Sequence, residues 1–268
     1  MVVVNRNGIS RESMPAYRTF RPPQVLSEIL RKFLGTEAGR DFTSLTGLFS
    51  APWKAVVMGG LLRDLLLNRL LRMDAKPADI DLVIFGANSI DEIRSKLERM
   101  THSTNAFGGV KCQLRPNGMV FDLWRVEDHT NMAMASKPHT IEQLLRHNLL
   151  DVDAILWDPV TDCLHDYGCL EAINTGRIGL MGPEGIAQEF LATQVAHVLM
   201  IAFKTGFSLS DDVRSFVANA SAHCRPIDIE RTLERKLPHL AAQIEKFWSD
   251  ILSGGTERCP APMRTVVP

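Results

Sequence analysis

The spacing of apolar residues along the chain predicts a mixed α/β region. Between residues 24 and 34 apolar side chains recur at helical spacing and Gly35 follows, so we expect a first helix there. Further on, short β-like runs alternate with helical ones: KAVVM (54–58), LLRDLLLNRLL (61–71), DIDLVIF (79–85), SIDEIRSKLERM (89–100), VKCQL (110–114) and MVFDLW (119–124). This alternation predicts fold class α/β (α+β), a mixed sheet with helices.

The last two runs are separated by the turn sequence 115–118, Arg-Pro-Asn-Gly. Proline fixes φ and Asn-Gly tolerates positive φ, so a β-hairpin is predicted there, with its second strand starting near Met119.

After Gly182 the β-like pattern fades and four stretches carry helical periodicity: 184–204, 210–222, 228–236 and 239–252. The residues after them have the Gly, Pro and polar content of a frayed terminus. The pattern therefore predicts four parts: an N-terminal extension (1–22), an α/β domain (23–182), a smaller all-helical domain (183–253) and a flexible tail (254–268).

Charge and composition narrow the function classes. Thirty basic residues against thirty-one acidic ones give a formal net charge of −1, which argues against the broad positive field of proteins that wrap long nucleic acids. No apolar run approaches the length of a membrane-spanning helix, and the first residues do not resemble a secretory signal. We therefore expect a cytoplasmic protein without membrane association. The five cysteines show no CxxC spacing, which favours reduced thiols over a disulfide framework.

A diglycine, Gly59-Gly60, lies between the run 54–58 and the helical run that follows it. The first backbone N–H groups of a helix have no intrahelical partner, and beside a loop without Cβ atoms they can cradle a phosphate. When the diglycine is taken alone, a tight strand-to-helix turn without a ligand is the better explanation of Gly-Gly.

Two carboxylates, Asp79 and Asp81, flank Ile80 at the start of the apolar run 82–85. Residues two apart in a strand project to the same face, so both carboxylates would meet there and repel one another unless a cation joins them. Mg²⁺ commonly takes one or two carboxylates together with substrate phosphates. The spacing thus predicts a magnesium site, with a solvated acidic loop as the alternative.

A third carboxylate, Asp122, stands in the middle of the apolar run MVFDLW. A buried acid in such a run needs a partner or a metal ion. If this strand lies beside the strand of Asp79 and Asp81, the three carboxylates could hold two ions roughly 4 Å apart. Exposure on an edge strand is the alternative.

Other motifs receive less support. The cluster Cys163, His165, Asp166 and Cys169 lacks regular zinc-ligand spacing, and the histidines show no HExxH pattern. The sequence also has neither a GxSxG nucleophile elbow nor a GxxxxGK[ST] phosphate loop.

The order Gly59-Gly60-Leu61-Leu62-Arg63-Asp64, then Asp79-Ile80-Asp81-Leu82, then Asp122 resembles the catalytic head of the DNA polymerase β nucleotidyltransferase superfamily. The nearest pattern is that of bacterial poly(A) polymerases and CCA-adding enzymes, with GGxVRDxLLG followed by DxD. The resemblance covers 54 to roughly 180. It implies a five-stranded mixed head sheet with helices, followed by a neck-like helical region.

The resemblance also implies residue roles. It assigns metal binding and catalysis to three carboxylates, Asp79, Asp81 and Asp122, and nucleotide binding to five residues, Gly59, Gly60, Arg63, Asp64 and Arg125. An ion pair that supports the glycine loop is the alternative role of Arg63 and Asp64.

Two departures from the family bear on the acceptor. The family's downstream motif RRDFTINAL corresponds to residues 146–156, where Asp153 stands in place of asparagine. The arginines that help relatives read the nucleobase are absent from the stretch 193–200. Addition of CCA to tRNA is therefore not favoured.

The resulting hypothesis is an Mg²⁺-dependent nucleotidyltransferase, with Mn²⁺ as an alternative ion. It would transfer a nucleoside monophosphate from a nucleoside triphosphate (NTP) to a hydroxyl acceptor and release pyrophosphate. The acceptor is left open between a small molecule, a protein and a short RNA end, and a homodimer is compatible with the shortened architecture. Two alternatives remain: a catalytically inactive nucleotide-binding module, and tRNA 3′-end repair with a partner chain.

Overall fold

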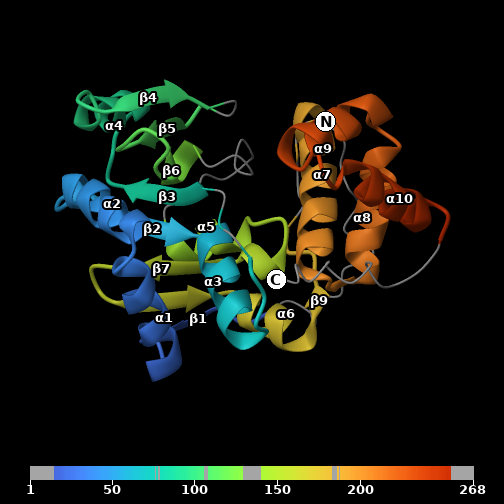
Figure 1. Cartoon of the computed structure of the whole chain (residues 1–268), viewed down its shortest axis with the longest axis horizontal. Coiled ribbons are helices and arrows are strands. Elements are labelled where there is room, and N and C mark those ends of the chain that lie inside the picture. The colour runs from blue at the N-terminus through green and yellow to red at the C-terminus, as the bar shows by residue number, and fades with distance from the viewer. Residues whose placement is uncertain are drawn as a thin grey trace, which may run out of the picture. The chain divides into compact units, whose positions relative to one another are not determined.

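The computed structural model describes residues 15–75, 77, 79–105, 108–128, 140–182, 186 and 188–254 (Figure 1). The chain forms two compact units. The first consists of Ala16–Arg146 and Asp153–Cys169, and the second includes His147–Val152 and the chain from Leu170 onwards. The tail predicted for 254–268 lies, apart from Gly254, outside the described residues, as does most of the predicted N-terminal extension.

The first unit is built on a mixed eight-stranded sheet in the order β1-β8-β7-β2-β3-β6-β5-β4. Within it β3 and β6 run parallel, and the other neighbouring strands pair antiparallel. The strands are β1 Arg18–Phe20, β2 Lys54–Met58, β3 Asp79–Phe85, β4 Thr101–Thr104, β5 Val110–Gln113, β6 Val120–Arg125, β7 Ile155–Asp158 and β8 Cys163–Asp166.

The mixed α/β class is confirmed, but the sheet is larger than the five strands expected. The edge strands β1 and β4 are short and carry polar sequences, RTF and THST, without the apolar alternation that identifies a half-buried strand. Pairing with β8 and β5 makes them strands. The predicted hairpin between β5 and β6 is confirmed, with Asn117 at a φ of 61° in its turn.

The helices of the first unit are α1 Gln24–Leu34, α2 Glu37–Thr46, α3 Gly60–Leu70, α4 Ile90–Lys96 and α5 Ile141–Arg146, and α6 Cys169–Thr175 begins at its last residue. Short 3₁₀ turns cover Gly47–Phe49, Val126–Asp128 and Asp151–Asp153. The sequence pattern did not predict α2, because this helix buries few large apolar side chains, chiefly Phe42 and Leu45. Its N-cap is Thr36, whose hydroxyl accepts a hydrogen bond from the Gly39 N–H at 3.1 Å.

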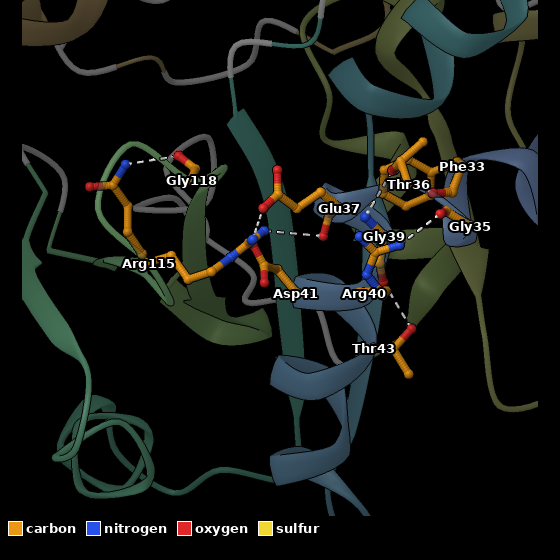
Figure 2. Close-up of polar contacts among 11 residues, drawn as sticks. Phe33, Gly35, Thr36, Glu37, Gly39, Arg40, Asp41, Thr43, Arg115 and Gly118 are labelled. Atoms are coloured by element: carbon orange, nitrogen blue, oxygen red, sulfur yellow. Dashed lines mark hydrogen bonds and ion pairs between the residues drawn. The ribbon is translucent and has the colours of Figure 1, made fainter.

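An arginine in the β5–β6 turn ties the sheet to α2 (Figure 2). The Arg115 guanidinium donates to Asp41 Oδ2 from two nitrogens, at 2.7 and 3.1 Å, and also pairs with Glu37. Asp41 is buried, so the two-nitrogen contact neutralises a carboxylate that water reaches poorly.

The core of the first unit lies on both faces of β2 and β3. On β3, Ile80, Leu82 and Ile84 fill one face and Val83 the other, each fully buried. This explains why the run 82–85 is continuously apolar: a strand covered on both faces shows no alternation.

The second unit is mainly helical, with α7 Gln188–Thr205, α8 Asp211–Ser221, α9 Pro226–Lys236 and α10 Ala241–Leu252. The predicted helices are thus found, but a short parallel pair, β9 Arg177–Ile178 with β10 Ser208–Leu209, adds to them. Across the described residues, no helix is both long and apolar enough to span a bilayer.

Candidate active site

Three carboxylates share one face of the two parallel strands at the centre of the sheet. Asp79 and Asp81 lie two positions apart on β3, and Asp122 on β6 is the register partner of Asp81. Register partners project to the same face, so all three side chains leave the sheet on one side. The structure therefore brings together the three acids that the sequence singled out.

Crowding of these acids changes the acidity of the central one. Burial, followed by the negative charges of Asp79 and Asp122, raises the pKa of Asp81 to about 7. A hydrogen bond from the Trp124 side chain acts in the opposite direction and lowers it. The cluster thus favours any added positive charge, whether a proton or a cation.

Asp122 is held by two neighbours from β5 and the loop before it. Lys111 Nζ lies 3.2 Å from Asp122 Oδ2, and Asn105 Nδ2 donates to Asp122 Oδ1 at 3.3 Å. Asp122 itself is 7% exposed. The acid in the apolar strand therefore has the partners that its burial requires. The sequence reasoning did not identify Lys111, although its place in a strand predicted to pair with that of Asp122 was the available signal.

The loop before β5 packs tightly against the site. Asn105 accepts a hydrogen bond from the Gly109 N–H at 2.9 Å, which fixes the amide that donates to Asp122. A Cβ on Gly109 would come within 2.7 Å of Trp124, 2.8 Å of Asn105 and 2.9 Å of the Leu123 carbonyl oxygen. Glycine is therefore required here by close approach to β6.

The diglycine forms a sharp elbow next to the carboxylates. Met58, the last residue of β2, pairs with Asp81, so the chain turns into α3 directly beside that acid. Gly59 has a φ of 67°, and its N–H donates to the Ile155 carbonyl at 2.9 Å. Helix α3 starts at Gly60, which places its first backbone N–H groups at the elbow.

Arg63 and Asp64 form a buried ion pair behind the elbow rather than an open site. Arg63 Nε donates to Asp64 Oδ1 at 3.0 Å, and its Nη1 pairs closely with Asp153. Burial opposes the guanidinium charge, but the two carboxylates outweigh it and raise the pKa of Arg63. The alternative reading of these residues, support of the glycine loop, fits this arrangement. Asp153 joins it because this residue lies next to the elbow, with its carbonyl oxygen 3.5 Å from where a Cβ on Gly59 would be.

Arg125 is not brought to the carboxylates. It follows Trp124 on β6 and pairs with Ile84, so it leaves the sheet on the face opposite Asp122. Its guanidinium lies 2.9 Å from Asp128 and 3.5 Å from Glu127, and it donates to the Asn88 carbonyl. We therefore assign Arg125 to the turn after β6 and do not carry it forward as a nucleotide contact.

The donor chemistry of the cluster suits a hard divalent cation. Among the described residues, no three Asp, Glu, His or Cys side chains already form a ready-made cation cage. Mg²⁺ does not need one, because it usually takes one or two carboxylates and completes its octahedron with water and substrate phosphates. Asp79 and Asp81 can supply those ligands, with Asp122 beside them. Of the weaker zinc cluster, His165 lies with its Nδ1 2.8 Å from the Tyr17 hydroxyl.

Solved structures of CCA-adding enzymes share this fold. The Thermotoga maritima CCA-adding enzyme complexed with tRNA_CCA matches with a TM-score of 0.59 and 17% identity, over 87% of this chain and 54% of that chain. A CCA-adding enzyme in complex with CTP matches with a TM-score of 0.60 and 18% identity, over 87% and 55%. The complex of a CCA-adding enzyme with ATP matches with a TM-score of 0.59 and 18% identity, over 87% of this chain and 54% of that chain.

The chain spans about half the length of these enzymes. At this level of identity the likeness concerns the fold, and it agrees with the resemblance drawn from the glycine and aspartate motifs. No family model matches the sequence, and no curated protein matches it.

Proposed function

We propose that the protein is a metal-dependent nucleotidyltransferase that transfers a nucleoside monophosphate from an NTP to a hydroxyl acceptor. The observation that carries this proposal is the placement of Asp79, Asp81 and Asp122 on one face of β3 and β6, beside the glycine elbow that starts α3. The shared fold with CCA-adding enzymes in complex with CTP and ATP supports the same class of donor substrate.

In the proposed reaction the acceptor hydroxyl oxygen bonds to the α-phosphorus of the NTP. The bond from that phosphorus to the oxygen bridging to the β-phosphate breaks, and pyrophosphate leaves. The hydroxyl proton passes to a carboxylate, a role we assign to Asp122. Bound Mg²⁺ or Mn²⁺ would neutralise the phosphate charge and the charge that develops on the entering and leaving oxygens.

The protein's own residues contribute position and charge. Asp79 and Asp81 would hold the metal ion, and the elbow at Gly59-Gly60 would offer backbone N–H groups to the triphosphate. Arg63 forms ion pairs with Asp64 and Asp153, so its contribution is to keep the elbow in place. Alignment of the acceptor with the α-phosphorus is the main source of rate that such a site can supply.

The acceptor is proposed only as a class. A small molecule, a protein hydroxyl and a short RNA end all offer the required nucleophile. A tRNA end is the acceptor suggested by the neighbour solved with tRNA, but this chain spans about half of that enzyme. Action on tRNA with a partner chain is therefore a subsidiary proposal.

A second candidate function is a nucleotide-binding module without turnover. One observation favours it: Lys111 is ion-paired with Asp122, the carboxylate to which we assign acceptance of the hydroxyl proton.

The test combines purified protein, each α-labelled NTP, Mg²⁺ or Mn²⁺, and acceptor pools of tRNA, total RNA, protein and small metabolites. Under the enzyme proposal, pyrophosphate release and label transfer occur and are lost in Asp79→Asn and Asp81→Asn. The control is Asp91→Asn, which changes an exposed side chain of α4 that pairs with Arg94 and should leave turnover unchanged. Nucleotide binding without label transfer to any pool would instead favour the module.

A further inference from the structure

A row of charged side chains crosses three strands at the candidate site. Lys111 on β5 is the register partner of Asp122 on β6, and Asp122 is the partner of Asp81 on β3. All three side chains therefore project from the same face of the sheet. The row places an ammonium group at one end of the carboxylate cluster.

The two members of the Lys111–Asp122 pair differ in their access to water. The side chain of Lys111 is 44% exposed, whereas that of Asp122 is 10% exposed. A lysine has a flexible four-carbon stem and a strongly hydrated head, so a half-exposed one can swing into solvent at little cost. The carboxylate cannot leave, because Asn105 also holds it and its strand is flanked on both sides, by β3 and β5. In this pair the lysine is the mobile partner.

We propose that Lys111 is a positioning residue that serves as the resident counter-ion of Asp122 and sets the affinity of the cluster for divalent cations. The ammonium of Lys111 would repel a metal ion held by Asp79 and Asp81. An ion that also bound Asp122 would have to displace that ammonium. This inference rests on the proposed function, since it takes the three acids as the metal-binding group.

The experiment measures Mn²⁺ binding to the full chain without nucleotide, by isothermal titration and by the electron paramagnetic resonance signal of free Mn²⁺. Removing a like charge from beside a divalent ion should strengthen binding by about tenfold in Lys111→Met. Lys111→Arg keeps the charge and should bind Mn²⁺ like the wild type. The matched control is Lys32→Met, an exposed lysine of α1, which should have no effect. Unchanged or weaker binding in Lys111→Met overturns the inference.

A second measurement uses the wild-type chain and does not depend on how a variant folds. Acetic anhydride labels amines that are not engaged in hydrogen bonds faster than engaged ones. Saturating Mg²⁺ should therefore increase labelling of Lys111 relative to Lys32, as read by peptide mass spectrometry. Equal labelling with and without Mg²⁺ contradicts displacement of Lys111.

Failure of the inference can be told apart from failure of the proposed function. Mn²⁺ binding that persists in the Asp79→Asn, Asp81→Asn double variant places the metal elsewhere and overturns both. Mn²⁺ binding that requires these two aspartates but ignores residue 111 overturns the counter-ion role alone. Absence of Mn²⁺ binding in every variant, including Lys111→Met, also overturns both.

Discussion

Arg63, in the first turn of α3, is ion-paired with Asp153, ninety residues later in the chain. Both side chains are buried, and the pair joins the start of α3 to the residue two positions before β7. Asp153 thus gives the Arg63 guanidinium a second carboxylate beside Asp64.

Asp153→Asn removes one of the two charges that neutralise Arg63. Because the guanidinium keeps Asp64, we expect a loss of about 2 kcal/mol in the free energy of unfolding, less than for a buried charge left wholly unpaired. Urea denaturation followed by circular dichroism measures this. Stability equal to that of the wild type would show that the pair contributes nothing.

Asp81 gives the metal-free protein a defined pH dependence. Its pKa is raised from 3.8 to about 7 in the folded state, so between these values the folded chain keeps a proton that the unfolded chain has lost. The contribution of protonated Asp81 to the free energy of unfolding is therefore complete below about pH 4 and is lost as the pH rises towards 7. Urea denaturation across this range should show that the free energy of unfolding falls by roughly 2 kcal/mol because of Asp81. Solvent at the open side of the cluster screens part of the interaction, so this fall is smaller than the full pKa shift would give.

The Asp81→Asn variant isolates that contribution. It has no proton to lose, so its stability relative to the wild type should grow as the pH rises from 4 to 7. Parallel curves for Asp81→Asn and the wild type would contradict the assignment.

Mg²⁺ should stabilise the wild type more at pH 8 than at pH 5, because the ion competes with the proton for the same carboxylates.

Gly109→Ala tests the close packing of the loop before β5. The added Cβ would overlap Trp124, Asn105 and the backbone of β6, so a loss of about 2 kcal/mol in unfolding free energy is expected. Gly47→Ala is a matched control, since a Cβ there meets nothing within 4 Å and the φ of −59° suits any residue. Thermal unfolding of the two variants should therefore diverge, and equal melting temperatures would refute the requirement for glycine at 109.

Arg115→Met tests the link between α2 and the β5–β6 turn shown in Figure 2. The substitution leaves the buried Asp41 carboxylate without its two-nitrogen partner, and a loss of about 1 kcal/mol is expected because Arg115 is itself partly exposed. Arg115→Lys should recover only part of this, since an ammonium cannot form the planar two-nitrogen contact. Chemical denaturation of both variants checks the order. Full recovery by lysine would show that charge alone matters.

Local periodicity in the sequence determined several elements to the residue. The helix at 24–34 and the strands at 54–58 and 79–85 were predicted with the bounds that the structure shows. Each of these segments carries a local signal of its own. The signal is either an apolar pattern that repeats within the segment or a glycine or aspartate at its end. The DxD spacing likewise fixed the common face of Asp79 and Asp81, because alternation within one strand is a local property.

Packing between distant segments determines which charged side chains lie together. The parallel register of β3 and β6 sets Asp122 opposite Asp81, and the hairpin register sets Lys111 opposite Asp122. Register follows from packing between distant segments, and a shift of one residue would send Asp122 to the other face. The same holds for Arg63 with Asp153 and for the polar edge strands β1 and β4, which become strands only through their neighbours. The sequence supplied the acids, and long-range pairing determined that Asp122 faces Lys111 and that Asp153 faces Arg63.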